Sequence, residues 1–336
     1  MLAIDICSKT VSIIDGIYSN GLLRASNCAH VEMKNDITND GVITDNTGLS
    51  ILLSNLIREN GLKSRTAAVT INTSQLVSRD FDFPALKVDM LNQLVRTEML
   101  QVLGIDKEYG VDYIINGDTA DTENNRLLSV RAYALPKTLI DSYYQLLKDI
   151  HISPVAMDIH ANSIVKLLRG AKINNNQNED LFLAVYIGNT TMEVNVFQKS
   201  GVPFSRLMVS PMDDFIKEYA AVSRKDVSEV SYSEIAFTEA ALEEDGISVE
   251  IKRGFLSRIT DELQRFVQFV LNNYSGRNIS RIYLFGAIAR FQNFETALTG
   301  QLNIPVEILN STQNVILPAG NKLNNYAHAA GALMRL

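Results

Sequence analysis

The chain has 336 residues, of which 46% are apolar and 21% are charged, and it carries 31 Lys and Arg against 38 Asp and Glu. Such a composition is typical of a protein that buries a core, and at about 150 residues per domain the length suggests two domains or one large lobed fold. The net charge of −7 argues against general nucleic-acid binding, which needs an excess of cationic side chains. No apolar run reaches the roughly 18 residues of a spanning helix, and the apolar start meets Asp5 at once, so neither a membrane span nor a secretory signal is expected.

The charge is unevenly distributed along the chain. Residues 79–151 carry a net charge of −4 and residues 206–254 a net charge of −5, which leaves +2 for the rest. The remainder is therefore able to tolerate an anionic ligand.

The cysteine and histidine residues give no indication of a metal site from their spacing. Cys7 and Cys28 show neither metal-ligand spacing nor a disulfide framework, which is typical of a reducing cytoplasm. His151 and His160 lie nine positions apart, with no Cys, His or Asp partners at ligand spacing, so a metal site is not expected there.

The first 75 residues read as β-β-β-α-β. Two apolar strands, at 2–6 and 11–15, flank a short polar break and predict a β-hairpin. A third strand is predicted at 22–31 and a fourth at 67–71. Between them, Leu49, Leu52, Leu53 and Leu56 have the spacing of one helical face.

The next seventy or so residues read as an inserted small domain with the order β-α-β-β-α. Its elements are predicted as a strand at 79–84, a helix across 91–102, strands at 113–116 and 127–134, and a helix at 136–150. Pro136 stands in the first turn of that last helix, where proline is well tolerated.

The second half of the chain repeats the opening design. After a helix that ends at Arg169, the polar tract 174–180 reads as a linker. Strands at 181–187 and 192–197 then enclose the polar turn 188–191, as in the first hairpin. This repetition predicts two lobes of similar topology.

The remaining segments are an acidic stretch and a second α/β series. Within the acidic segment, residues 235–244 are predicted as a solvated helix. The following elements are predicted as an amphipathic helix from Leu256 to Val270, a buried strand at 281–285, a loop at 286–290, a strand at 305–309 and a small-residue helix at 325–336.

Three strand ends carry a family resemblance. The turns at 5–10 and 186–191 and the strand-loop at 284–290 resemble, in order, the two phosphate loops and the adenosine loop of actin-like ATPases. More closely, nearly the whole chain resembles the PilM type of type IV pilus assembly protein. Its further motifs are Ala68–Ile71, Phe81–Pro84, Ser153–Asp158 and Tyr326–Ala332.

The resemblance implies an α/β, actin-like (ribonuclease H-like) two-lobed fold with inserted small subdomains. The first lobe would comprise 1–78, 152–175 and 310–336, and the second 180–205 and 255–309. An inserted α/β subdomain would occupy 79–151, and an acidic subdomain 206–254.

The resemblance also implies a nucleotide site for ATP or ADP with Mg²⁺, and Asp5 would hold the metal through water. A hairpin turn aims several backbone N–H groups in one direction, and hydroxyl and ammonium groups add donors for phosphate. The alternatives are structural roles without a ligand: Asp5 and Ser8 would only form hydrogen bonds within a hairpin turn, and Glu262 would lie on a solvated helix face. The residues that the resemblance places at the nucleotide are Asp5, Cys7, Ser8, Lys9, Thr10, Gly188, Asn189, Thr190, Glu262, Gly286 and Ala287.

Three positions depart from the family pattern. Cys7 stands where the family usually has Gly, Tyr186 where it usually has a second Asp, and Gly286-Ala287 where it has a Gly-Gly pair. A side chain at a phosphate loop hinders close approach of the backbone, and a missing carboxylate removes a group that handles Mg²⁺ or water. We therefore expect weak nucleotide binding and very slow or no hydrolysis, and we assign no catalytic residue.

The resemblance implies a binding scaffold. Such proteins bind the cytoplasmic N-terminal peptide of a PilN-like single-span membrane protein, together with other pilus platform proteins, and the groove is expected beside the 79–151 insert. The expected location is the cytoplasm at the inner face of the membrane, with membrane contact only through the partner, because the sequence ends in the 325–336 helix and not in a basic amphipathic tail. The alternatives are an ATP-dependent small-molecule kinase of the actin superfamily and an FtsA-like polymerising protein.

Overall fold

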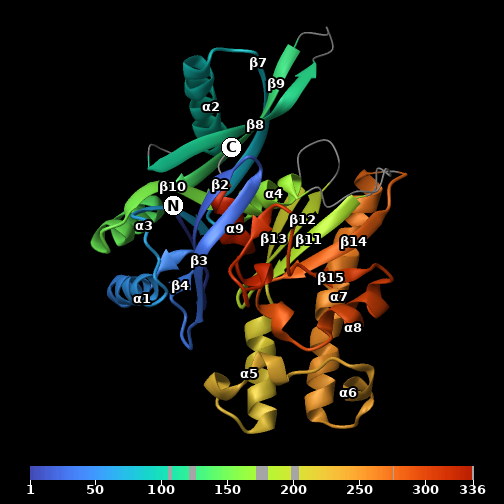
Figure 1. Cartoon of the computed structure of the whole chain (residues 1–336). Helices are drawn as coiled ribbons and strands as arrows, with labels where there is room; N and C mark the ends of the chain where they lie inside the picture. The colour runs from blue at the N-terminus through green and yellow to red at the C-terminus, as the bar shows by residue number, and fades with distance from the viewer. Residues whose placement is uncertain (105–107, 121–125, 172–180, 198–203, 275, 335–336) are drawn as a thin grey trace.

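Two separate sheets form the centres of two lobes, and a third sheet stands above the first lobe (Figure 1). The computed structural model describes residues 1–336 with the exception of 105–107, 121–125, 172–180, 198–203, 275 and 335–336.

The first sheet has six strands in the order β10-β6-β1-β2-β3-β16. The hairpin of the two opening strands is antiparallel, and the first strand also pairs in parallel with β6, as the predicted β-β-β-α-β order requires. The strands are β1 (Leu2–Ile6), β2 (Thr10–Ser19), β3 (Leu22–Glu32), β6 (Thr66–Ile71), β10 (Ser153–Ile159) and β16 (Val315–Ile316).

Helices cover both faces of this sheet, and for that reason every residue of β1 is buried. Leu2, Ile4 and Ile6 point to one face, where α1 (Asn46–Glu59) and α3 (Lys137–Asp149) pack. Ala3 points to the other face, which α4 (His160–Gly170) and α9 (Ala327–Leu333) cover. A small two-stranded ribbon, β4 (Thr38–Asn39) and β5 (Val42–Ile43), lies before α1.

The second sheet repeats the topology of the first and confirms the predicted pair of similar lobes. Its strand order is β13-β12-β11-β14-β15, in which β11 pairs antiparallel with β12 and parallel with β14. The strands are β11 (Leu181–Ile187), β12 (Thr191–Phe197), β13 (Phe204–Val209), β14 (Ile279–Phe285) and β15 (Val306–Ile308).

The helices of the second lobe surround an aromatic core built around Phe215, Phe255 and Phe291. The prediction of a helix at 235–244 is wrong in its first half, because Ile235 and Phe237 are buried and Ala236 forms a β-bridge. The helices are α5 (Met212–Ser223), α6 (Glu239–Glu243), α7 (Ile247–Asn273) and α8 (Phe294–Leu302).

Four short 3₁₀ turns are also found among the described residues. They are η1 (Val227–Glu229), η2 (Tyr232–Glu234), η3 (Ala287–Arg290) and η4 (Leu323–Asn325). Among the helices of the described ranges, none is both long and apolar enough to cross a bilayer.

The third sheet has the strand order β7-β9-β8, and one helix packs on one of its faces. Val130, Ala132 and Ala134 of the central strand pack on the helix, whereas Arg131 and Tyr133 point to the opposite face. The helix of residues 137–149, which the sequence analysis places in this insert, packs its buried face in the core of the first lobe. The elements are β7 (Val77–Pro84), α2 (Val88–Leu103), β8 (Tyr109–Ala120) and β9 (Arg126–Pro136).

Candidate functional site

The two hairpin turns that the sequence places at a nucleotide face each other across the boundary between the lobes. Each turn is closed by a backbone hydrogen bond of 2.9 Å, from Cys7 to Thr10 and from Gly188 to Thr191. The Thr190 hydroxyl donates to the Ser8 hydroxyl at 3.1 Å and joins the two turns directly. The predicted site residues of both lobes are therefore brought together.

The space between these turns is very small. The cavity has a volume of about 30 Å³, close to that of a single water molecule, whereas ligand pockets span roughly 300–1,000 Å³. Six predicted residues line it: Asp5, Cys7, Thr10, Asn189, Gly286 and Ala287. In the conformation of this structure the cleft has no room for a nucleotide.

The Tyr186 ring fills much of the gap between the phosphate and adenosine loops. Gly286, at a φ of +91°, passes so close that a Cβ there would lie 2.7 Å from two ring carbons. The Tyr186 hydroxyl donates to Cys7 Sγ at 3.3 Å. Burial, reinforced by Cys7 and Asp5, raises the pKa of Tyr186 well above its ordinary value, so the phenol is neutral. The side chain of Tyr186 therefore fills the space between Gly286 and Cys7.

Asp5 lies against two histidines that the sequence analysis did not assign to the site. His160 Nε2, at the start of α4, lies 2.7 Å from Asp5 Oδ1, and His328 Nδ1, in α9, lies 3.7 Å from Asp5 Oδ2. The two imidazole rings stack with centroids 3.6 Å apart. Their positions 155 and 323 residues after Asp5 explain why local spacing gave no indication of the cluster.

The electrostatics of the cluster follow from its burial and its charges. Burial alone raises the pKa of the Asp5 carboxyl, but the charge and hydrogen bond of His160 outweigh it and hold that pKa well below its ordinary value. In turn, burial opposes the charged form of His160, but Asp5 raises its pKa well above 6.5. Burial and the neighbouring His160 lower the pKa of His328 to about 4.

The Mg²⁺ ion that the fold family implies does not fit this arrangement. Mg²⁺ prefers octahedral oxygen ligands and keeps several waters. Asp5 Oδ1 is engaged by His160, and the cavity of about 30 Å³ leaves no room for a hydrated ion. The residues present therefore do not provide a Mg²⁺ site in this conformation.

Lys9, predicted to contact phosphate, instead forms an ion pair between the lobes. Its Nζ lies 2.9 Å from Oδ1 of Asp213, in the first turn of α5, and both side chains are largely buried. Asn189 donates to Asp213 at 3.3 Å and to the Tyr232 hydroxyl at 2.7 Å. The only sequence signal for this ion pair is that two acidic residues stand at the start of a helix.

The adenosine loop makes a further contact between the lobes. The Arg290 guanidinium lies 4.0 Å from the centroid of the Tyr232 ring and forms an ion pair with Glu32 of β3. Glu262, by contrast, does not line the cleft. It pairs with Arg265 on the half-exposed face of α7.

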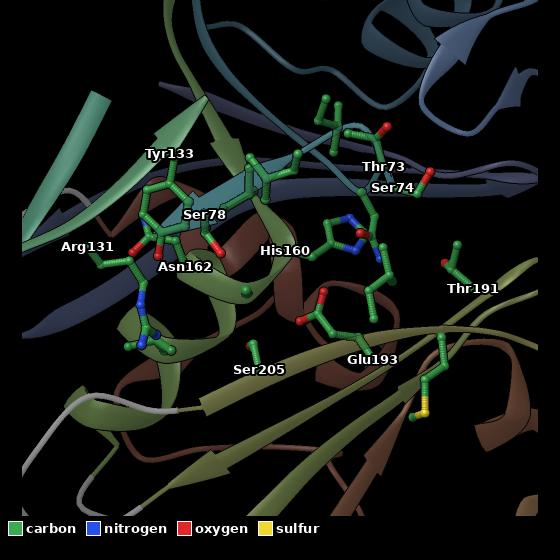
Figure 2. A pocket seen from close by; sticks show the side chains of 18 of the residues that line it. Thr73, Ser74, Ser78, Arg131, Tyr133, His160, Asn162, Thr191, Glu193 and Ser205 are labelled. Carbon is green, nitrogen blue, oxygen red and sulfur yellow. The ribbon is translucent and has the colours of Figure 1, made fainter. Parts of the chain in front are cut away.

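A much larger groove lies on the other side of His160, between the insert and the two lobes. Its volume is about 970 Å³, and its mouth is open to solvent. Figure 2 shows side chains converging on it from all three parts of the molecule. The labelled residues are Thr73, Ser74, Ser78, Arg131, Tyr133, His160, Asn162, Thr191, Glu193 and Ser205.

One wall of the groove is the face of the insert sheet that does not pack on α2. Ser78 pairs with Tyr133 and Asp80 with Arg131 across neighbouring strands, so these four side chains share that face. Arg131 donates to Asp80 through two nitrogens at 2.7 and 2.8 Å, a bidentate pair. Ile114 of β8 lies opposite Arg131 and adds an apolar surface.

The opposite wall comes from the edge of the second sheet. Glu193 of β12 is buried and accepts a hydrogen bond of 2.8 Å from Asn195, and its carboxyl group faces the His160 ring (Figure 2). Burial raises the pKa of Glu193. The strand β13 adds apolar residues, of which Val209 is 87% exposed.

Several solved structures are similar to this chain over nearly its whole length. The solved PilM–PilN type IV pilus biogenesis complex is similar over 99% of this chain and 97% of that chain, with 16% identity and a TM-score of 0.80. The ethanolamine utilization protein EutJ from Carboxydothermus hydrogenoformans covers 99% and 89%, with 11% identity and a TM-score of 0.55. MreB5 of Spiroplasma citri bound to ADP covers 98% and 94%, with 13% identity and a TM-score of 0.50.

These likenesses show the actin-like fold that the sequence predicted. A search of curated protein sequences gave no significant match. The family model of the type IV pilus assembly protein PilM, however, matches residues 3–334. The chain therefore belongs to the family of type IV pilus assembly proteins PilM.

Proposed function

We propose that the chain is an actin-like scaffold of a type IV pilus assembly platform, and that its groove binds the cytoplasmic N-terminal peptide of a PilN-like single-span membrane protein. The observation that carries the proposal is the groove of about 970 Å³, one wall of which is the unpacked face of the insert sheet. The PilM–PilN complex among the similar structures names a partner of this kind for that protein.

The chemistry of the groove suits an extended peptide. Two edge strands, β7 of the insert sheet and β13 of the second sheet, lie beside it, and each has one side that pairs with no strand among the described residues. An edge strand binds a peptide by adding it to the sheet, while alternate side chains enter pockets. Ile114 and the exposed Val209 offer apolar contacts, and Arg131, Glu193 and Tyr133 offer polar ones.

Binding of this peptide would set the location of the protein. A single-span partner presents its N-terminal segment in the cytoplasm, so a scaffold bound to it lies at the inner face of the membrane without entering the bilayer. The membership of the PilM family favours this function over a small-molecule kinase or an FtsA-like filament. Nucleotide binding stays a prediction, since it requires the Tyr186 ring to leave the gap between the loops.

The proposal is tested with a fluorescent peptide of the cytoplasmic N-terminal sequence of a PilN-like protein from the same organism. Ile114 lines the groove, whereas its neighbour Ile115 is 53% exposed and is not among the lining residues. We expect Ile114→Glu to weaken binding in fluorescence anisotropy by at least about tenfold, because a carboxylate would be desolvated on the apolar wall. Ile115→Glu should bind like the unchanged chain. Equal binding by both variants would place the peptide elsewhere.

A further inference from the structure

We propose that Asp5, Cys7 and His160 form a binding site for one transition-metal ion of the zinc class. The site needs no nucleotide, because all three ligands come from the chain. It is independent of the peptide groove, although His160 lines the groove as well.

The three ligand atoms already lie close together. The carboxylate oxygen of Asp5, Cys7 Sγ and a ring nitrogen of His160 are all within 4.8 Å of one another. Cys7 Sγ lies 3.7 Å from Asp5 Oδ1, and His160 Nε2 lies 2.7 Å from the same oxygen. In a tetrahedral zinc site, ligand atoms are separated by about 3.3–3.6 Å. The two separations measured from Asp5 Oδ1 therefore differ from that geometry by about 1 Å or less.

The burial of the cluster distinguishes it from a chance group of surface residues. Asp5 and His160 are almost fully buried, and Cys7 is partly buried beneath the turn. His160 Nδ1 and His328 Nε2 are buried nitrogens without a hydrogen-bond partner in the described ranges. These are the ring nitrogens opposite to those that face Asp5, so the ligand to an ion would be His160 Nε2, and His160 Nδ1 would remain for an outer partner.

The donor set selects the class of metal. A thiolate, an imidazole and one carboxylate are ligands that zinc and similar transition metals accept, whereas Mg²⁺ and Ca²⁺ prefer oxygen. The charges also balance, since a divalent cation would neutralise the Asp5 carboxylate and the Cys7 thiolate, while the thiol proton and the His160 Nε2 proton pass to solvent on binding and leave a neutral imidazole. A cavity of about 30 Å³ lined by Asp5 and Cys7 is large enough for an ion or a water and excludes a nucleotide.

Two neighbours would support the ligands without binding the ion. The Tyr186 hydroxyl faces Cys7 Sγ at 3.3 Å, as an outer donor to a metal-bound sulfur does. His328 stacks on His160 with an interplanar angle of 19° and fixes the orientation of its ring. The fourth coordination position is open to a water from the small cavity.

The test uses Co²⁺ as an optical probe on the metal-stripped full chain. We expect one equivalent of Co²⁺ to bind and to give a thiolate-to-cobalt charge-transfer band, with Zn²⁺ displacing it. Cys7→Ser should lose the band, whereas Cys28→Ser should keep it. Cys28 is the matched control because it is the second free cysteine and belongs to no metal-ligand cluster of the described residues.

A thermal measurement keeps the test decisive if Cys7→Ser does not fold. Zn²⁺ is expected to raise the melting temperature of the unchanged chain and of Cys28→Ser, because an ion that binds only the folded state stabilises it. His160→Gln should lose at least tenfold in Zn²⁺ affinity, and Mg²⁺ should produce no shift at the same concentration. Absence of a charge-transfer band at equimolar Co²⁺, or a band that survives in Cys7→Ser, would overturn the proposal.

Discussion

The Tyr186 hydroxyl donates to Cys7 Sγ at 3.3 Å and joins the two lobes at the centre of the cleft. The two residues stand where the resemblance expects an Asp and a Gly, so two of the three departures from the family pattern meet in one contact. Where two phosphate loops would enclose a ligand, the chain closes the gap with its own side chains.

Replacing Tyr186 by Ala is expected to open the nucleotide cleft. Loss of a buried aromatic ring costs about 3–4 kcal/mol of unfolding free energy, so the variant should melt at a lower temperature. Mg²⁺-ATP should then raise its melting temperature by more than it raises that of the unchanged chain, because the ring no longer fills the space beside Gly286.

Tyr143→Ala is the control for this experiment. Tyr143 is an equally buried tyrosine, but it packs in the core of the first lobe and donates to the Gly41 carbonyl at 2.6 Å. Its loss should destabilise the chain without adding an ATP-dependent shift. A large shift in the unchanged chain, or none in Tyr186→Ala, would contradict the role assigned to the ring.

The ion pair between Lys9 and Asp213 is expected to stabilise the contact between the lobes. Asp213→Ala should lower the free energy of unfolding by about 1–2 kcal/mol, because it leaves the largely buried ammonium of Lys9 without its partner. Asp214→Ala removes the neighbouring, exposed carboxylate from the same first turn of α5 and should change stability by less than about 0.5 kcal/mol. Urea unfolding measures both free energies. Equal losses in the two variants would mean that the carboxylates act only on the helix dipole and that the ion pair with Lys9 contributes nothing.

Asp15 is expected to give the stability a dependence on pH. Burial raises its pKa, but hydrogen bonds from the Ser64 hydroxyl and amide and the Lys63 amide outweigh burial and hold the pKa below its ordinary value. The Met1 amino group, 3.8 Å away, acts in the same direction. The stabilisation is therefore complete above the unfolded pKa of about 3.9 and is lost as the pH falls through the lower folded value.

The measurement compares Asp15→Asn with the unchanged chain by urea unfolding at several pH values. At pH 7 the variant should be less stable by about 2 kcal/mol, since a charged acceptor of several hydrogen bonds is lost. Below about pH 4 the difference should shrink. A difference that stays constant across this range would show that the charge of Asp15 contributes nothing.

Gly331 is expected to be essential for the packing of α9 on α4. A Cβ at this position would overlap the backbone carbonyl of Ser163, which cannot move aside as a flexible side chain can. Gly331→Ala should therefore cost about 3 kcal/mol of unfolding free energy. Gly254→Ala, in the exposed part of α7 with open space around it, should be neutral or stabilise by up to about 1 kcal/mol. Thermal unfolding that ranks the two variants in the opposite order would refute the packing argument.

Much of the fold was predictable because its signals are local. The hairpins of β1-β2 and β11-β12 follow from apolar strands around polar turns, and α7 follows from a long apolar stripe. The prediction of a solvated helix at 235–244 failed in its first half. Two apolar residues there are buried in the core of the second lobe, and the helix begins only at the acidic stretch that follows them. The packing of α3 on the first lobe depends on tertiary contacts that a sequence pattern does not record.

The site was predictable only in part, for a related reason. The turns that carry Asp5, Cys7 and Gly286 were found from their position after buried strands. The contact of Asp5 with His160 and His328 joins residues far apart in the chain, and it exists only because α4 and α9 pack together beneath the turn. The substitution at Tyr186 was visible in the sequence, whereas its consequence, a filled cleft, was visible only in three dimensions.

Hydrogen exchange of the chain with and without the PilN-like N-terminal peptide tests the central claim most directly. The edge strands β7 and β13 have outer amides that a bound strand would cover. We predict peptide-dependent protection in residues 73–80, 159–162 and 204–209, which contribute to the lining of the groove, and none along the exposed face of α2. Protection confined to α2 or to the turns of the cleft would contradict the proposed binding site.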